Sequence, residues 1–582
     1  MNPGRPVHRT RSPSPLWLLL GGISACHASS DAEAKLTDSP EAGACQHSAD
    51  AAASSHDVLT QHNDVGRTGA TLSETVLDTC NVANVVQLGA YAVDDEVYAQ
   101  PLYASGISTH QGTKNLLLVA TMADSLFAFD ADQPGSAPLW QLGQQHELGT
   151  PALSSRNVGG NNGILATPVI DPSAGRVFLV SRDCDQTAPP TFPSCIQRLF
   201  AIELATGKVL SSAEVAGVAP AAAGVSGTRF DPNLHWSRAA LLLQHDQLFV
   251  SFGSGPNGDA HEEDFSFHGW LFGYRASDLS QPPSVYCSTP GFGGGAIWQS
   301  GNGPAADEDA VYFATGNGIH QPTPVAPAGF PEQPEGDEDS VVRVPLSAPV
   351  SSLHYWDDRP YHADGNVFQY MEKNDIDVGT AGPLLIPGST QLIAGGKSGI
   401  LYTLDRATLQ PTQAPIEAFS SPALASGQSK YIYSYSGGPH LHGSPAFVRL
   451  DDADGNPGPG LIFYWPALER LTSFSYDYAS GLVTQLADAA VPKVDSGGTL
   501  AISADGGRPD SAILWASAVD TDSGGHLWAL SASHLTRLWD AKLPAWAKFA
   551  VPTIAAGRVY LASTSSTSGT QSEIVVFGLP PR

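Results

Sequence analysis

Short apolar runs recur along most of the chain, and polar segments rich in glycine and proline separate them. Runs of this length between turn residues are typical of buried β-strands. The first group shows the unit best, with runs at 101–103, 116–119, 125–130 and 139–140. No long apolar segment with a helical period follows the N-terminus, so the pattern predicts an all-β chain with many turns.

A common opening sequence introduces this unit eight times. Two or three small or polar residues, usually with a proline, precede the first strand of each unit. The openings are Ala99-Gln100-Pro101-Leu102, Ala166-Thr167-Pro168-Val169, Ser237-Arg238-Ala239-Ala240, Asn302-Gly303-Pro304-Ala305, Ala381-Gly382-Pro383-Leu384, Gly443-Ser444-Pro445-Ala446, Gly498-Thr499-Leu500-Ala501 and Ala550-Val551-Pro552-Thr553. Repeated four-stranded units predict an eight-bladed β-propeller with antiparallel blades.

The last unit lacks a fourth strand. Its strands are expected at 552–554, 559–561 and 574–577. The apolar stretch 85–93 precedes the first unit and has no other place in the pattern, so we expect this N-terminal strand to complete the last blade and close the ring. A β-sandwich array or a β-helix would also explain the repeats, but neither needs a closing strand.

The charge balance limits the classes of partner. The chain has 29 basic and 57 acidic residues, for a net charge of −28. Binding to nucleic acid or to anionic lipid headgroups needs clustered lysine and arginine, which argues against both as partners. The composition fits a soluble surface, and we expect a monomer in which residues 57–582 form one propeller domain.

The N-terminus has the features of an export signal. Three arginines precede an apolar core at 16–23 that is too short to span a bilayer permanently. The following Ile23-Ser24-Ala25-Cys26 resembles the bacterial lipobox, in which the cysteine is lipidated. This resemblance implies a signal peptide over 1–25 and a lipid anchor at Cys26. The alternative is an ordinary secretory signal cleaved near Ala25.

Both interpretations of the N-terminus place the protein outside the cytoplasm. The residue directly after Cys26 is His27 and not an aspartate, so we expect an outer-membrane lipoprotein of the cell envelope, attached to the membrane only through its lipid anchor. Residues 26–56 are rich in alanine, serine and acidic residues, which predicts a disordered tether. Cys184 and Cys195 flank a polar insertion between two strands, and an oxidising envelope would allow them to form a disulfide.

The middle of the chain resembles a known family. The stretch 293–307, followed by Val311–Gly318, resembles one blade of the quinoprotein dehydrogenases, and the similarity continues through 374–377 and 382–406. His62–Gly69 is similar to the opening segment of such propellers. The resemblance covers most of the chain after about Leu59. It implies an eight-bladed propeller that holds pyrroloquinoline quinone and calcium on its axis.

The resemblance also assigns binding roles to single residues. Asn317 of the Thr-Gly-Asn motif matches a calcium ligand, and Glu263 or its neighbour Asp264 would supply the calcium-binding carboxylate. Lys397 matches the axial lysine of the cofactor site, and Trp298 belongs to the same site. Calcium prefers six to eight oxygen ligands, so these residues alone do not complete a calcium site.

The catalytic features of the family are incomplete here. Pro345 stands about where the resemblance places the catalytic acid, and proline cannot accept a proton. Asp377 is the candidate replacement, although its place before a first strand favours a structural role as a turn cap. The adjacent cysteine pair that flanks the quinone in many members is absent from the sequence.

Other polar residues lie just before first strands, where the chain of a propeller approaches the axis. His440 and His442 are two residues apart, so an extended chain places them on one side. They would suit a metal or ligand at the channel mouth, or a hydrogen-bonded structural feature. Trp236 and Arg238 combine an aromatic face with a hydrogen-bond donor and would suit a planar ligand or a sugar.

Three functions remain open. The incomplete catalytic site favours a module that binds an envelope protein or a small-molecule ligand and is not an enzyme. A divergent dehydrogenase for alcohols or aldoses, dependent on pyrroloquinoline quinone and calcium, would use Asn317, Lys397, Trp298 and Asp377. The third function is an outer-membrane assembly factor, which is suggested by fold and location alone.

Overall fold

The computed structural model describes residues 56–151, 161–185, 194–219, 227–254, 266–290, 293–318, 337–347, 354–357, 376–417, 440–452, 454–494, 497–520, 524–563 and 572–581. Every described residue belongs to the unit His47–Arg582. Cys26 and Glu263 lie outside the described residues, as do the predicted signal peptide and nearly all of the tether. The interpretations that rest on them remain predictions.

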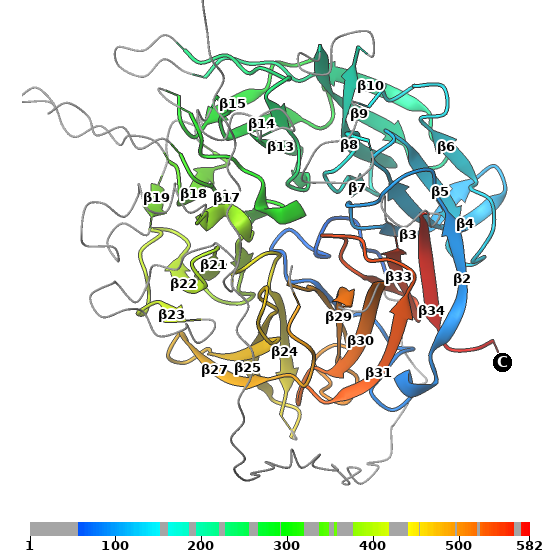
Figure 1. Ribbon diagram of the computed structural model, residues 1–582, viewed down its shortest axis with the longest axis vertical. Helices are drawn as coiled ribbons and strands as arrows, with labels where there is room; N and C mark the ends of the chain where they lie inside the picture. Colours follow the sequence, from blue (N-terminus) through cyan, green and yellow to red (C-terminus); the bar gives the residue numbers. More distant parts are fainter. Residues whose placement is uncertain are drawn as a thin grey trace, which may run out of the picture. The chain divides into compact units, whose positions relative to one another are not determined.

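Eight antiparallel sheets are arranged as the blades of a ring (Figure 1). The first four blades are formed by β3 (Leu102–Thr109), β4 (Gly112–Ala120), β5 (Leu126–Asp130) and β6 (Trp140–Leu142); by β7 (Val169–Asp171), β8 (Arg176–Cys184), β9 (Cys195–Glu203) and β10 (Val209–Glu214); by β11 (His235–Trp236), β12 (Leu242–Gln244), β13 (Gln247–Ser254), β14 (Trp270–Arg275) and β15 (Ser284–Cys287); and by β16 (Ala305–Ala306), β17 (Ala310–Ala314), β18 (Ser340–Pro345) and β19 (His354–Asp357).

The other four blades complete the ring. They are formed by β20 (Leu384–Leu385), β21 (Gln391–Gly395), β22 (Ile400–Asp405) and β23 (Ile416–Glu417); by β24 (Ala446–Asp451), β25 (Pro457–Tyr464), β26 (Thr472–Asp477) and β27 (Leu482–Asp488); by β28 (Thr499–Ser503), β29 (Ile513–Asp520), β30 (Gly524–Ser531) and β31 (Arg537–Leu543), with β1 (Ala70–Thr71) added; and by β32 (Thr553–Ala555), β33 (Arg558–Ser563), β34 (Glu573–Gly578) and β2 (Val86–Ala92). Six of the eight predicted openings end at the first residue of a blade's first strand, whereas 237–240 lies between β11 and β12 and 498–501 overlaps the start of β28. The eight blades confirm the predicted propeller.

The predicted ring closure is also confirmed. Strand β2 pairs antiparallel with β34, so the first long strand of the chain completes the blade formed by the last strands. Tyr91 on β2 is fully buried, and its hydroxyl donates to the backbone oxygen of Asp130 in blade 1 at 2.7 Å. The closing strand therefore also joins the last blade to the first.

Apolar clusters fill the spaces between neighbouring blades. One cluster combines Phe178 and Val180 of blade 2 with Phe252 and Phe272 of blade 3, all nearly or fully buried. Each blade is therefore stabilised by burial against the next one around the ring. Within the residues that the structure describes, no helix is long and apolar enough to cross a membrane.

The segment Val58–Thr71, here called the hub segment, contacts the first strands of the blades across the ring (Figure 1). Backbone N–H groups from six blades donate to hub carbonyls at 2.7–3.0 Å. The pairs are Tyr103 to Val58, Ile170 to Leu59, Ala306 to Val65, Leu385 to Gly66, Phe447 to Thr68 and Ile502 to Gly69. The side chains of Arg67 and Thr71 reach the backbone oxygens of Leu241 and Ile554 in the two remaining blades.

Arg67 of the hub segment is fully buried, with 0% of its surface exposed. Its guanidinium donates to the backbone oxygens of Pro304 at 2.8 Å, Gln61 at 2.7 Å and Leu241 at 3.2 Å, and to the hydroxyl of Thr60 at 2.8 Å. Burial lowers the pKa of Arg67 to about 10, so the side chain stays charged at neutral pH. Its donors satisfy carbonyl groups that the centre of the ring would otherwise leave unpaired.

The predicted partners Cys184 and Cys195 form a disulfide. They are directly opposite each other at the ends of β8 and β9, with Cα atoms 4.0 Å apart. The bond closes the connection between the second and third strands of blade 2. Cys287 is a free, buried cysteine on β15, and burial raises the pKa of its thiol to about 12.

Candidate functional site

The blade topology brings two kinds of connection to the same face of the ring. Because successive strands are antiparallel, the start of a blade's first strand and the hairpin between its second and third strands lie at the same end. Arg238, Trp298, His442 and Lys548 precede first strands, whereas Lys397 lies in the hairpin between β21 and β22. These side chains meet near the axis, and with Phe549 they are here called the axial cluster.

Two aromatic rings of the axial cluster each have two cations nearby. The Arg238 guanidinium carbon lies 4.8 Å from the ring centre of Trp298 and 5.3 Å from that of Phe549. The Lys397 ammonium is 5.4 Å from the Trp298 ring centre, and the Lys548 ammonium is 4.9 Å from the Phe549 ring centre. Blades 3, 4, 5 and 8 therefore place three basic side chains beside two aromatic faces.

His442 lies between the two aromatic rings. Its ring centre is 5.9 Å from that of Trp298 and 6.3 Å from that of Phe549, and its Nδ1 is 3.1 Å from the hydroxyl oxygen of Ser300. Burial, the neighbouring His440 and the surrounding cations lower the pKa of His442 well below the usual value. At neutral pH it is therefore an uncharged hydrogen-bonding group between three cations.

His440 and His442 lie together, with ring centres 4.5 Å apart. Within the described residues, no group of three or more histidine, cysteine, aspartate or glutamate side chains is arranged to hold a metal ion. A metal site at this position remains a prediction.

Asp377 and Lys397 form an ion pair beside the axial cluster. The Lys397 Nζ lies 2.7 Å from Oδ2 of Asp377, and Oδ1 of Asp377 accepts a hydrogen bond from the backbone N–H of Asn317 at 2.8 Å. A Cβ atom at Gly316 would lie 2.5 Å from Asp377 Oδ1 and 3.1 Å from Nε1 of Trp298, so the Thr-Gly-Asn loop packs closely against both. Asp377 thus holds Lys397 and this loop in place.

The turn-cap interpretation of Asp377 does not describe its side chain. Asp377 stands at the N-cap position of the 3₁₀ helix η5 (Val378–Thr380), but its carboxylate makes no capping hydrogen bond. Its oxygens go to Lys397 and to the loop of blade 4. Asn317 lies 60 residues earlier, in blade 4, and Lys397 lies in a later hairpin of blade 5, so the local sequence around Asp377 does not reveal either contact.

Buried acidic residues lie at the opposite end of β18 from Pro345. Pro345 pairs with Ala310 at the end of β18 remote from the Thr-Gly-Asn loop. Asp337, Glu338 and Asp339 immediately precede β18 and are 7%, 4% and 2% exposed. The absence of an acid at Pro345 therefore says little about the axial face, because that position is at the wrong end of the strand.

Hydrogen bonds place these acids beside the Thr-Gly-Asn loop. The backbone N–H of Asp339 donates to the oxygen of Gly316 at 2.9 Å, and Oδ1 of Asp339 accepts from the N–H of Val378 at 3.1 Å. Asp337 accepts a hydrogen bond from the Tyr286 hydroxyl at 2.7 Å. In the sequence, the only sign of these acids was the run Gly-Asp-Glu-Asp directly before a predicted strand.

Trp236 packs against Phe549, one of the aromatic side chains of the axial cluster. It is 4% exposed and belongs to an apolar cluster with Tyr98, Met122, Leu165 and Phe549. Its indole N–H donates to the backbone oxygen of Gly163 at 3.3 Å. Trp236 therefore packs behind Phe549, whereas Arg238, two residues later, enters the axial cluster.

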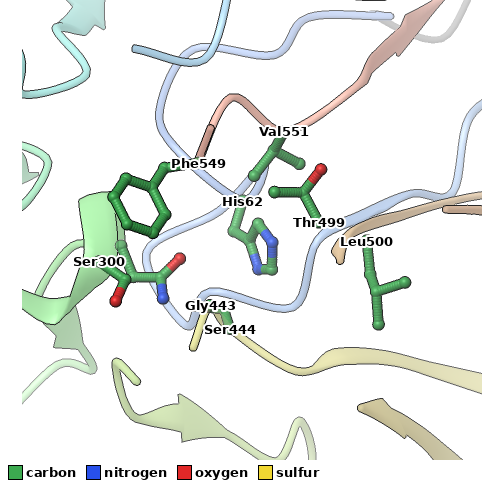
Figure 2. A pocket seen from close by; sticks show the side chains of 9 residues that line it. His62, Ser300, Gly443, Ser444, Thr499, Leu500, Phe549 and Val551 are labelled. Atoms are coloured by element: carbon green, nitrogen blue, oxygen red, sulfur yellow. The ribbon is translucent and has the colours of Figure 1, made fainter. Parts of the chain in front are cut away.

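A small pocket lies between the axial cluster and the hub segment. Figure 2 shows the imidazole of His62 at its centre, with Phe549 and Ser300 on one side and Thr499 and Val551 on the other. Burial lowers the pKa of His62 to about 4, so this imidazole is neutral near pH 7. Phe549 and Ser300 line the pocket and also contact His442, so the two regions adjoin.

The family resemblance implies two bound groups, pyrroloquinoline quinone and calcium, and the residues of the site do not suit them equally well. Trp298 offers a flat face, and Arg238, Lys397 and Lys548 offer positive charge, which fits the planar tricarboxylate pyrroloquinoline quinone. Among the described residues, Asn317 is not joined by enough oxygen ligands for calcium, and Asp377 is engaged by Lys397. The described part of the chain therefore fits the quinone better than it fits the metal.

No protein-family model matches the chain, and no curated protein matches its sequence. The structure is similar to a quinohemoprotein alcohol dehydrogenase from Pseudomonas putida HK5, with a TM-score of 0.57, 13% identity and coverage of 90% of this chain and 82% of that one. A europium-containing methanol dehydrogenase gives a TM-score of 0.57 at 13% identity, covering 90% of this chain and 98% of that one.

A third similar structure is the quinohemoprotein alcohol dehydrogenase from Comamonas testosteroni. It has a TM-score of 0.54 and 15% identity, and the match covers 90% of this chain and 81% of that one. At these identities the similarity concerns the fold and not the chemistry. The chain therefore has the eight-bladed propeller fold of the quinoprotein alcohol dehydrogenases.

Proposed function

We propose that this propeller binds a planar, carboxylate-bearing small molecule at its axial cluster. The observation that carries this proposal is the placement of three cations beside two aromatic faces, with Arg238 near both rings. Like charges brought together in a partly buried site repel each other, so an anion between them gains more than it would at an isolated lysine. Aromatic faces favour a flat ligand over a compact anion such as phosphate.

Direct titration with pyrroloquinoline quinone tests this proposal. We expect saturable quenching of tryptophan fluorescence, because Trp298 would lie against the ligand, and weaker binding at higher salt. Arg238→Met and Lys548→Met should each weaken binding about 10- to 100-fold, the value of one charge-assisted contact of roughly 1.5–3 kcal/mol. Lys208→Met is the matched control, because Lys208 is exposed in the turn between β9 and β10.

The Lys208→Met control distinguishes binding at the axial cluster from non-specific attraction of an anion to any lysine. Equal affinities for wild type, Arg238→Met and Lys548→Met would contradict binding at the axial cluster. Titration with and without calcium distinguishes calcium-dependent from calcium-independent binding of the ligand. Binding that needs calcium would require oxygen ligands outside the described residues, whereas calcium-independent binding would agree with the donors that the described residues supply.

A second candidate function is a quinone-dependent oxidoreductase for an alcohol or an aldose. The observation in its favour is the group of buried acids Asp337, Glu338 and Asp339 beside the Thr-Gly-Asn loop, since substrate oxidation needs a nearby proton acceptor. When bound, the quinone would accept the electrons. Dye reduction that requires quinone, occurs with a panel of alcohols and sugars and is lost in Asp337→Asn or Asp339→Asn would favour this function. Tight quinone binding without dye reduction would favour the non-enzymatic ligand-binding module.

We also propose that the protein acts in the cell envelope as a lipoprotein anchored through Cys26. The support is the lipobox-like sequence and the polar segment between it and the propeller. Metabolic labelling with a clickable fatty acid should modify the wild-type chain in a bacterial host that processes lipoproteins. Cys26→Ser should abolish the label, while an unlabelled but exported wild-type chain would favour the ordinary secretory signal.

A further inference from the structure

Lys548 differs from Lys397 in how it is held. Lys397 has Asp377 as an ion-pair partner, whereas no hydrogen bond or ion pair joins Lys548 to another described residue. Its ammonium lies near the Phe549 ring, and the residue is partly buried. Lys548 lies two residues before the opening of blade 8 and is followed by Phe549.

The charged groups around Lys548 disfavour its protonated form. Arg238 and Lys397 are the cations that act on it, and the neighbouring His442 is neutral. Burial together with these two cations lowers the pKa of Lys548 to about 8. At pH 7.5 about a quarter of such amines are neutral, against roughly one in a thousand for an ordinary lysine. The neutral amine is therefore about 200 times more abundant at Lys548 than at an unperturbed lysine.

We propose that Lys548 is a nucleophilic amine that forms an imine with aldehydes or ketones that carry a carboxylate. A lysine beside other cations and aromatic surface, without a carboxylate partner, is the setting in which amines attack carbonyl groups. Arg238 is placed to hold the carboxylate, since it is near both aromatic rings. This inference rests on the proposed function, because it uses the same anion-binding cluster and adds a reactive class of ligand.

The reaction needs no oxidant or reductant. The Nζ lone pair attacks the carbonyl carbon, a proton moves from nitrogen to the former carbonyl oxygen, and a carbinolamine forms. Loss of the hydroxyl group together with the remaining N–H proton, as water, leaves a C=N bond, and addition of water reverses the step. Only water is released, so the atoms and electrons balance and the ligand is held covalently but reversibly.

The test uses 4-carboxybenzaldehyde, which is planar, anionic and carbonyl-bearing. The full chain is incubated with this probe at a series of pH values, reduced with borohydride to fix any imine, and analysed by peptide mass spectrometry. We expect the adduct at Lys548 to form about 100-fold faster than at the exposed Lys208 at pH 7.5, with an inflection near pH 8. Labelling at equal rates, or an inflection near pH 10, would overturn the proposal.

Two variants sharpen the result. Lys548→Arg keeps the positive charge but removes the nucleophile, so it should lose the adduct and still bind terephthalate, a planar dicarboxylate without a carbonyl. Arg238→Met removes one neighbouring cation, so the inflection for Lys548 should move to higher pH. An unchanged inflection would mean that the cations do not activate the amine, which contradicts the proposal.

The failures of the two proposals are distinguishable. If the wild type binds terephthalate or pyrroloquinoline quinone but gives no adduct at Lys548, the imine is refuted and anion binding stands. If Lys548 reacts selectively but free terephthalate neither binds nor competes, the reactive amine stands and the proposed anion site is wrong.

Discussion

The ammonium nitrogen of Lys397 lies 2.7 Å from a carboxylate oxygen of Asp377, and both side chains are more than nine-tenths buried. The pair joins a hairpin of blade 5 to the segment that opens the same blade, and the second carboxylate oxygen reaches the loop of blade 4. A buried charge that loses its partner keeps its desolvation cost without compensation. This relationship therefore fixes the geometry on one side of the axial cluster.

Lys397→Met should lower the free energy of unfolding by about 3–5 kcal/mol, because Asp377 would be left buried and unpaired. Urea unfolding followed by circular dichroism measures the change. The double variant Lys397→Met/Asp377→Leu removes both charges and should recover a large part of the loss. A double variant as unstable as the sum of both single variants would show that the two residues act independently.

Gly303→Ala should destabilise the ring through Arg67. A Cβ atom at position 303 would lie 2.3 Å from one guanidinium nitrogen of Arg67 and 2.7 Å from its central carbon, so the guanidinium must leave its carbonyl partners. We expect a loss of at least about 2 kcal/mol in urea unfolding. In an Arg67→Met background the same alanine should cost little, and an undiminished cost there would contradict this explanation.

Replacing Cys184 and Cys195 together by serine should lower stability by about 3 kcal/mol. The two residues are 11 positions apart, and releasing a loop of this size increases the entropy of the unfolded chain by that amount in the loop-closure model. Reduction of the wild type should produce the same loss, and the serine variant should not respond to reductant. A wild type unaffected by reduction in the unfolding assay would contradict the prediction.

His442 should make the protein less stable in acid. Its pKa is lowered in the folded state, so the unfolded chain takes up a proton first as the pH falls below about 6.5. The contribution of the neutral imidazole is therefore complete above pH 6.5 and decreases by about 1.4 kcal/mol per pH unit below it. His442→Gln should be less stable than wild type at pH 7.5, and the difference should narrow towards pH 5. Parallel stability curves for the two proteins would show that His442 is not the titrating group.

The repeated openings predicted the blades correctly because they depend on local physics. Each opening ends a polar segment and begins a buried strand, and a shift by one residue would turn every apolar side chain to the wrong face. Ring closure was predictable because 85–93 had no other partner, and β2 indeed pairs with β34. These features lie in the sequence pattern of each segment and need no knowledge of distant contacts.

The axial cluster was only partly predictable. Trp298, Lys397, Arg238 and His442 were identified from the resemblance or from their place before first strands, but Lys548 and Phe549 were not, although they precede the opening of blade 8 in the same way. The position alone predicts proximity to the axis and does not predict which side chains meet there. Those contacts depend on the rotation of eight blades about one axis, which local patterns do not encode.

The contacts of the hub segment were less predictable still. The hub segment makes mostly one backbone hydrogen bond to each strand that it contacts. Apart from β1, it therefore lacks the alternation of apolar and polar residues that marks a strand in a sequence. The sequence around Arg67 resembles a propeller opening but gives no sign that one guanidinium bonds to backbone oxygens from the hub itself and from two blades. Such a role becomes visible only when the whole ring is assembled.

The hub segment also sets the order in which this chain can mature. A ribosome releases Val58–Thr71 and β2 first, yet their partners in the later blades, including Ile502, Ile554 and β34, are made last. Contacts over such long sequence separations are slow to form. The earliest residues must therefore wait, with their carbonyl groups hydrated, until synthesis is nearly complete. A chaperone or an export channel that keeps the chain extended during this interval would protect it from pairing with the wrong strands.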